Sequence, residues 1–421
     1  KTGIYMMIRM FMDILQPIPE WWGFTLMIIG SVTALLGVLY ALAENDIKRL
    51  LAYSSIENVG IILLGLGSSL SFYSLGMHSL ALLGLVAALF HTLNHAIFKS
   101  LLFLGAGSVI SETHTRNMEN YGGLIKYMPQ TALFFLVGSM AISSLPPLNG
   151  FFSEWMTFQA IFQGIATLGI STRWVFIIAG SSLAFTGGLA LACFVKAFGT
   201  IFLARPRSSE VNHARESSIY LKMSMGSLAI LSLLFGLLSG FVSASIEKVG
   251  RGLSIFNEVS SFVSVSPFGN ISAGNLPSIS GPLMFGSLVV IILGVLFATK
   301  YFVYGEQKIK IGNTWDCGID LTPRMEITSA GFAHSIITIF KGVLKPSLQH
   351  DVEYHDADIR YLPETRTVTL SVRDVYHQYL YRPLNILVEV LSKKAKKIQS
   401  GNINAYILYI FIALLVALYF V

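Results

Sequence analysis

Charged residues are scarce in this chain: they make up 12% of its 421 residues, whereas hydrophobic residues make up 53%. Soluble globular domains carry about 25% charged residues, so the composition excludes an ordinary soluble protein. The mean hydropathy of +0.65 also indicates a chain that is more apolar than an ordinary soluble protein. Apolar stretches of about 18 residues or more recur along the chain, and each can cross a hydrocarbon core of about 30 Å as a helix. The sequence therefore predicts an all-α, polytopic transmembrane helix bundle.

Cysteine is also scarce, with Cys193 inside an apolar stretch and Cys317 in a polar one. Iron–sulfur clusters and structural zinc sites need several cysteine or histidine ligands at short spacing, and the sequence has no C-x-x-C pair. It also has no glycine-rich dinucleotide motif after a strand. We therefore predict no cofactor, no metal and no redox chemistry in this chain alone.

No basic patch accompanies the net charge of +6, because lysine and arginine are scattered in short loops between the apolar stretches. This distribution indicates membrane topology and not a nucleic-acid partner. Alternating spans place most of these residues on one side, which we expect to be cytoplasmic: Lys48, Arg49, Arg116, Lys126, Arg205, Arg207, Arg215, Lys308 and Lys310. The opposite side receives Arg173, Lys248 and Arg251.

Hydropathy and length predict about nine membrane segments: residues 1–16, 22–44, 53–72, 79–111, 129–164, 173–204, 219–243, 281–304 and 402–421. The stretch 79–111 is too long for a simple crossing, so it is strongly tilted or kinked. The stretch 129–164 contains Pro146-Pro147-Leu148-Asn149-Gly150, where a helix must break. The chain starts at Lys1 without methionine and with an apolar run already under way, so we expect a truncated start.

Between residues 305 and 400 the chain becomes polar, with Trp315-Asp316-Cys317-Gly318 followed by a mixed charged cluster from His350 to Asp358. This composition predicts a loop region. From about 370 to 398, apolar residues recur near helical spacing and end in a lysine-rich run. The pattern predicts an amphipathic helix lying along the membrane surface or another subunit.

Three ionisable residues follow one another at a spacing of four in the middle of an apolar stretch: His91, His95 and Lys99. On a helix they share one face, with neighbours about 6 Å apart. Ionisable residues inside a membrane usually face protein or water and serve a task. Histidine titrates near neutral pH, which suits a proton relay. The alternative is that the histidines only link helices and Lys99 extends to a lipid headgroup.

Glu154 directly follows the predicted helix break. Breaks in transporter helices leave free backbone groups that line ion paths, so a carboxylate there suits a proton stop. The alternative is a glutamate at the membrane surface on a re-entrant loop.

Three further residues are weaker candidates for proton transfer. Lys196 lies inside the span 173–204 and is either an exit station or a lysine that extends to the headgroups. Glu57 is a possible proton site, or else it caps its helix or pairs with Lys48 or Arg49. Lys1 precedes an apolar helix, and its depth depends on what lies upstream.

Three ordered motifs resemble the antiporter-like subunits shared by respiratory complex I, Mrp-type sodium/proton antiporters and membrane-bound hydrogenases. They are D-I-K-R-L-L-A-Y-S-S-I-E-N-V-G at 46–60, F-H-T-L-N-H-A-I-F-K-S-L-L-F-L-G-A-G-S-V-I at 90–110 and S-S-L-P-P-L-N-G-F-F-S-E-W at 143–155. The opening K-T-G-I-Y, the segment N-T-W-D-C-G at 313–318 and the C-terminal run I-Q-S-G-N-I-N-A-Y are similar to the large antiporter-like subunit of group 4 nickel–iron hydrogenases, the formate hydrogenlyase type.

The resemblance implies a fold with two inverted repeats and discontinuous helices. It divides the chain into the end of the first antiporter-like repeat (1–21), the second repeat (22–204), additional transmembrane helices (205–306), a cytoplasmic loop with an amphipathic lateral helix (307–400) and a C-terminal transmembrane helix (401–421). It also implies site residues: Lys1 as the lysine that bridges the repeats, Lys99 as the central lysine, and Glu154 as the terminal ionisable residue. Complex I's most distal subunit has lysine at that last position, so the sign of the exit charge stays open.

The resemblance further implies a proton-translocating subunit of a redox-driven complex in the inner (cytoplasmic) cell membrane. Its partners would be other membrane subunits of a group 4 hydrogenase or complex I-like assembly, membrane lipids and, indirectly, peripheral nickel–iron and iron–sulfur subunits. Two alternatives stay open. One is an Mrp-type sodium/proton antiporter subunit, and the other is a structural membrane anchor that does not pump. The coupled ion and its direction are not fixed by the sequence.

Overall fold

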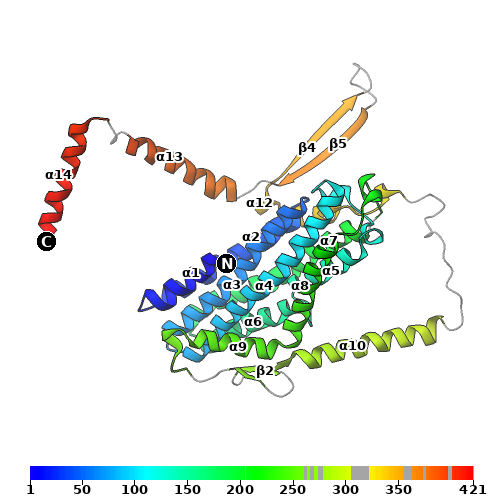
Figure 1. Ribbon diagram of the computed structural model, residues 1–421, viewed down its shortest axis with the longest axis horizontal. Helices are drawn as coiled ribbons and strands as arrows, with labels where there is room; N and C mark the ends of the chain where they lie inside the picture. Colours follow the sequence, from blue (N-terminus) through cyan, green and yellow to red (C-terminus); the bar gives the residue numbers. More distant parts are fainter. Residues whose placement is uncertain are drawn as a thin grey trace. The chain divides into compact units, whose positions relative to one another are not determined.

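The computed structural model describes residues 1–203, 205–259, 263–265, 270–273, 278–304, 322–354, 363–372, 376–396 and 401–420 (Figure 1). The chain divides into two units, Lys1–Thr338 and Ile339–Val421, and each is described by itself.

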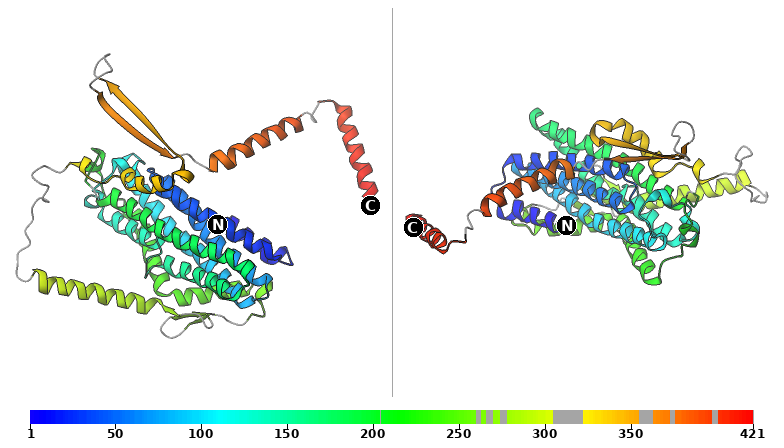
Figure 2. Two further views of the ribbon diagram at one scale, coloured as in Figure 1. Left: turned by 180° about the vertical axis from the view of Figure 1, so that it is seen from behind. Right: turned by 90° about the horizontal axis from the view of Figure 1, so that it is seen from above.

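Helices build the first unit. They are α1 (Thr2–Arg9, continued by a π-helical turn Met10–Ile14), α2 (Glu20–Ala43), α3 (Ile47–Ser74), α4 (His78–Thr113), α5 (Pro129–Ile142), α6 (Asn149–Thr167), α7 (Ile170–Phe198, continued by Gly199–Leu203), α8 (Ile219–Leu237), α9 (Ser239–Arg251), α10 (Gly281–Ala298, continued by Thr299–Tyr304) and α11 (Ser329–Ile339). Short 3₁₀ turns cover Met118–Asn120, Leu124–Lys126, Glu210–His213, Ser254–Phe256 and Pro323–Met325. Strands β1 (Val263–Val265), β2 (Asn270–Ala273) and β3 (Ile279–Ser280) form a small antiparallel sheet. Helices α2 to α8 run side by side (Figure 2).

Six helices of the described residues are long and apolar enough to cross a membrane: Glu20–Ala43, Ile47–Ser74, His78–Thr113, Ile170–Leu203, Ile219–Leu237 and Gly281–Phe302. Each coincides with one of the predicted segments. Of the other three, 129–164 is divided between α5 and α6, and the predicted spans 1–16 and 402–421 hold shorter helices.

Helix α4 lies at the centre of the unit and contacts α3, α5, α6, α8 and α9. It is one continuous α-helix of 36 residues, about 54 Å long at 1.5 Å per residue. The stretch predicted to be too long for a simple crossing is therefore one long helix without a break. Because α4 is surrounded on several sides, its polar residues can meet partners from several other helices.

The predicted break between α5 and α6 is confirmed. Helix α5 ends at Ile142 and α6 begins at Asn149. A β-carbon on Gly150 would lie 2.0 Å from the carbonyl oxygen of Ala141, so only glycine fits where the two helix ends approach each other. Tight packing therefore fixes the geometry of the break.

One end of the bundle gathers the predicted basic loops. The Ile47 N–H donates to the Arg116 carbonyl (3.1 Å), and the Met118 N–H donates to the Asn45 carbonyl (2.9 Å). The Arg207 guanidinium donates to the Met118 carbonyl (3.2 Å). These contacts confirm that the loops following α2, α4 and α7 share one end, whereas Lys308 and Lys310 lie outside the described residues.

The second unit contains α12 (Lys341–Leu344), the antiparallel strands β4 (Pro346–Tyr354) and β5 (Pro363–Val372), a π-helical turn Tyr376–Tyr381, α13 (Arg382–Lys396) and α14 (Ile403–Phe420). The predicted loop is wrong where the hairpin lies, and so is the predicted helix start near 370. The run T-V-T-L-S-V at 367–372 alternates polar and apolar β-formers, a strand signal that helical spacing further along obscured. Residues 313–318 and 355–358 lie outside the described residues.

Candidate functional site

One face of α4 carries the predicted row of His91, His95 and Lys99, which we call the file, and this row is buried inside the bundle. His91, His95 and Lys99 are 1%, 4% and 6% exposed. The alternative in which Lys99 extends to a headgroup is wrong, because its ammonium donates to the Leu51 carbonyl (2.8 Å) and to the Ser54 hydroxyl. Helix α3 therefore supplies a polar cradle for the lysine.

Glu57 lies two turns beyond Leu51 on the same helix and is 1% exposed. The charges of Lys99 and Glu154 both act on it, and its Oε2 has no hydrogen-bond partner. It does not cap α3: the Asp46 carboxylate does, accepting from the N–H groups of Lys48 (2.8 Å) and Arg49 (3.0 Å). The capping alternative for Glu57 is therefore wrong, and a buried carboxylate joins the site.

His91 belongs to a buried hydrogen-bond network whose other members are neutral polar residues. Its Nε2 lies 3.2 Å from Asn58 Oδ1 on α3, and its Nδ1 lies 3.0 Å from Ser153 Oγ on α6. Asn94 Nδ2 donates to Ser153 Oγ (3.0 Å) and to the Asn149 carbonyl (2.8 Å). The network thus joins α3, α4 and α6 beside the helix break.

Helix α8 reaches the same network. The Ser232 hydroxyl donates to Asn149 Oδ1 (2.7 Å), and the Asn149 amide donates to Asn94 Oδ1 (3.1 Å). Reasoning from charges missed these residues because none of them is ionisable. Asparagines inside apolar stretches were the available signal, since buried amides need partners.

Lys1 and His95 are in contact: the Lys1 ammonium is hydrogen-bonded to His95 Nδ1. His95 Nε2 has no partner within the described residues. The structure thus brings together all the candidates along α4 that the sequence singled out.

Glu154 lies in the second turn of α6 and is 7% exposed. It lines a cavity of about 240 Å³ between α6 and α7, together with Ser143, Ser144, Phe151, Trp155, Phe158, Leu183, Ala184, Gly187 and Gly188. Glu154 therefore lies inside the protein on a helix and not on a loop. A β-carbon on Gly187 would lie 4.0 Å from Glu154 Oε2, so the α7 glycines leave room beside the carboxylate.

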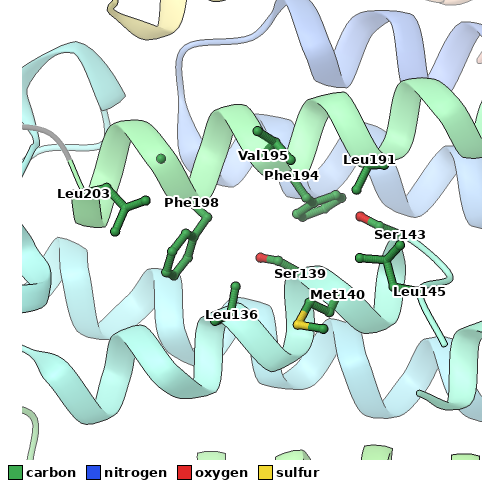
Figure 3. Close-up of a pocket in the computed structure, with 11 residues that line it drawn as sticks. Leu136, Ser139, Met140, Ser143, Leu145, Leu191, Phe194, Val195, Phe198 and Leu203 are labelled. Atoms are coloured by element: carbon green, nitrogen blue, oxygen red, sulfur yellow. The ribbon is translucent and has the colours of Figure 1, made fainter. Parts of the chain in front are cut away.

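A second cavity of about 300 Å³ lies between α5 and α7 (Figure 3). Its walls are mostly apolar, but Ser139 and Ser143 line it, and their buried hydroxyls have no partner within the described residues. Ser143 also lines the cavity that holds Glu154. Buried hydroxyls without protein partners usually bind ordered water, so this junction is a place where water can reach Glu154.

Lys196 has a different environment from the file. It is 1% exposed, and its ammonium donates to the carbonyls of Leu42 (2.6 Å) and Glu44 (2.7 Å) at the C-terminal end of α2. Lysine is well suited to hold terminal helix carbonyls. The alternative in which Lys196 extends to the headgroups is wrong, because its ammonium is buried against the end of α2, and its role as an exit station stays a prediction.

The buried ionisable file, the broken helix and the bundle define a polytopic membrane protein of the antiporter-like class. Residues 1–181 match the family described as NADH:quinone oxidoreductase/Mrp antiporter, TM.

Curated relatives match beyond this domain. Hydrogenase-4 component B of Escherichia coli (strain K12) is 36% identical over 427 residues, which cover 99% of this chain and 62% of that protein. Formate hydrogenlyase subunit 3 of the same organism is 37% identical over 328 residues, covering 78% of this chain and 51% of that protein. The chain therefore spans about half to three fifths of the length of these relatives.

Solved structures share the fold. A chain of the archaeal membrane-bound sulfane sulfur reductase has a TM-score of 0.67 at 24% identity, covering 99% of this chain and 60% of that chain. A chain of the Mrp complex from Dietzia sp. DQ12-45-1b has a TM-score of 0.51 at 20% identity, covering 61% of this chain and 51% of that chain. The predicted all-α antiporter-like fold is confirmed.

Proposed function

We propose that the chain is a proton-translocating, antiporter-like membrane subunit of a redox-driven complex. One observation carries this proposal: His91, His95, Lys99, Glu57 and Glu154 are buried around α4, and the exposed Lys1 contacts His95. A charge at mid-membrane depth costs at least about 2.5–3.5 kcal/mol, so such a group is rarely kept without a task.

Electrostatic coupling can move a proton along this file. Unit charges several ångströms apart interact by a few kcal/mol at an effective dielectric constant near 20. A change of charge at Lys1 therefore acts on His95, which it contacts, and then on Lys99 and Glu57. Glu154, beside its cavity, takes up or releases the proton.

The proposal extends to partners and location through the relatives. Their names are those of hydrogenase and formate hydrogenlyase components. We therefore assign the chain to a hydrogenase-type complex of the inner cell membrane, where other membrane subunits adjoin it and peripheral nickel–iron and iron–sulfur subunits carry the electrons. The chain itself supplies ion movement.

The test compares Lys99→Ala with Lys126→Ala in membrane vesicles that contain the whole complex. Lys126 is exposed in the loop between α4 and α5, so it is a matched lysine outside the file. Lys99→Ala is expected to abolish acidification driven by substrate oxidation, whereas Lys126→Ala keeps it. Unchanged acidification in Lys99→Ala, with intact redox turnover, would support a non-pumping anchor instead.

A measurement of sodium dependence distinguishes the second candidate function, a sodium/proton antiporter subunit. The fold is shared with an Mrp complex, and a sodium/proton antiporter subunit of Staphylococcus saprophyticus is 28% identical over 356 residues. Acidification that requires sodium and is lost in Glu154→Gln would favour a sodium/proton exchanger. Acidification independent of sodium is expected.

A further inference from the structure

Ser153 lies between the two parts of the site. Its hydroxyl is fully buried, lies 3.0 Å from His91 Nδ1, accepts from Asn94 Nδ2 (3.0 Å) and can donate to the Gly150 carbonyl (3.0 Å). The next residue in the chain is Glu154. Ser153 therefore touches the histidine directly and shares a helical turn with the carboxylate.

The tautomer of neutral His91 follows from its other neighbour. Asn58 Nδ2 donates to the Ser54 carbonyl (2.7 Å), which fixes the orientation of the amide and leaves Oδ1 facing His91 Nε2. A carbonyl oxygen only accepts hydrogen bonds, so Nε2 must carry a hydrogen. In the neutral ring Nδ1 is then an acceptor.

Ser153 has one hydroxyl hydrogen and two acceptors that compete for it. When His91 is neutral, Nδ1 needs that hydrogen, since Asn94 already donates to Asn149 and to Ser153. When His91 is protonated, Nδ1–H donates to Ser153 Oγ, and the hydroxyl hydrogen turns to the Gly150 carbonyl. The charge on His91 thus selects one of two hydroxyl positions.

The Gly150 carbonyl connects this choice to Glu154. In an α-helix the N–H of residue 154 donates to the carbonyl of residue 150, so both Ser153 and Glu154 meet at one oxygen in the first turn of α6. Hydrogen bonds in a chain polarise one another where the dielectric is low. The start of α6, from Gly150 to Glu154, therefore senses the protonation of His91.

We propose that Ser153 is a positioning residue that transmits the protonation state of His91 to the helical turn that carries Glu154. Its consequence for transport rests on the proposed function, but the hydroxyl switch itself does not. The charge of Lys1 acts on His91, the charges of Lys1, Lys99 and His91 act on His95, and those of Lys99 and Glu154 act on Glu57 of α3.

The first test needs no change at Ser153. The complex with ¹⁵N-histidine is reconstituted in liposomes, and His91 is assigned by the solid-state NMR signal that disappears in His91→Gln. At alkaline pH, a proton on Nε2 and a hydrogen-bonded, unprotonated Nδ1 are expected. A proton on Nδ1 would overturn the proposal. Ser153→Ala is expected to remove the hydrogen bond at Nδ1, and an unchanged Nδ1 signal would contradict the assignment.

The second test measures protons moved per turnover. Ser153→Ala is expected to lose the protons that this subunit moves, because the hydroxyl between His91 and the Gly150 carbonyl is gone, and Ser153→Thr, which keeps the hydroxyl, should restore them in part. Thr157→Val is the matched control, because this buried hydroxyl on the same helix donates only to the Ser153 carbonyl (3.0 Å). Equal losses in Ser153→Ala and Thr157→Val would reduce Ser153 to a packing role. If wild type moves no protons but shows the expected tautomer, the proposed function fails and the switch stands.

Discussion

The charges of Lys99 and Glu57 act on each other, yet the lysine is bonded to the Leu51 carbonyl and to Ser54, while Glu57 Oε2 has no hydrogen-bond partner. The ammonium therefore has two competing sites on one helix, a neutral cradle and a carboxylate. A lysine with two such sites can change partner when the charge around it changes, which is the property that a proton-loading group needs.

This arrangement predicts a loss of translocation in Glu57→Gln. The amide keeps the shape of the carboxylate but lacks its charge, so the protons that this subunit moves per turnover should be lost while the complex still assembles. Glu20→Gln is the control, since Glu20 is exposed at the start of α2. The measurement is vesicle acidification together with redox turnover in the same vesicles. Equal ratios of protons to turnovers in Glu57→Gln and Glu20→Gln would exclude Glu57 from the proton path.

Gly150→Ala should destabilise the fold strongly. Its β-carbon would meet the Ala141 carbonyl at 2.0 Å, so the helix ends at the break must separate, at a cost of about 3 kcal/mol or more. Gly107→Ala in α4 is the comparison, because nothing lies within 4 Å of its β-carbon, and alanine there should be neutral or stabilising by up to about 1 kcal/mol. Thermal unfolding in detergent, followed by circular dichroism, measures both. A melting temperature of Gly150→Ala equal to that of the wild type would contradict the packing at the break.

Water beside Glu154 is testable with cysteine chemistry. In a background with Cys193→Ala and Cys317→Ser, Ser144→Cys lines the Glu154 cavity, whereas Phe162→Cys lies on the same helix pair's outer surface, 52% exposed. A small water-soluble thiol reagent should modify Ser144→Cys, because thiolates form and react only where water reaches them. Phe162→Cys, facing lipid, should be protected. Protection of Ser144→Cys would argue against a hydrated cavity.

Lys196→Met should weaken the end of α2 without stopping translocation. The carbonyls of Leu42 and Glu44 then lose the ammonium as a donor. Each buried carbonyl left without a donor costs about 1–3 kcal/mol of stability. Lys196→Arg keeps a charged donor and should retain most stability. The readouts are thermal unfolding and protons per turnover. Full stability with lost translocation in Lys196→Met would restore its reading as an exit station.

Much of the site could be predicted because charge inside a membrane is costly and therefore conspicuous. The spacing of His91, His95 and Lys99 and the helix break before Glu154 identified one face of α4 and one end of α6 from the sequence. The partners of these residues could not be predicted in this way. Asn58 and Ser153 reach His91 from helices that lie 33 and 62 residues away along the chain, and only the packing of helices brings them together.

Two of the readings that the structure contradicts have physical causes as well. Lys196 lies near the end of a span, where snorkelling is the usual expectation, but the end of α2 presents the carbonyls of Leu42 and Glu44 to its ammonium. The hairpin of β4 and β5 follows a period of two in a polar region whose neighbours follow a period near 3.6. A hydropathy pattern read across the hairpin and the helix that follows it therefore places the start of the helix too early.

The central claim is that protons pass through Lys99 and Glu154 inside this chain. The most direct measurement is the number of protons moved per electron pair by the whole complex in vesicles, comparing wild type with Glu154→Gln. The account predicts that Glu154→Gln keeps redox turnover and loses the protons that this subunit carries. An unchanged ratio of protons to electrons would contradict it.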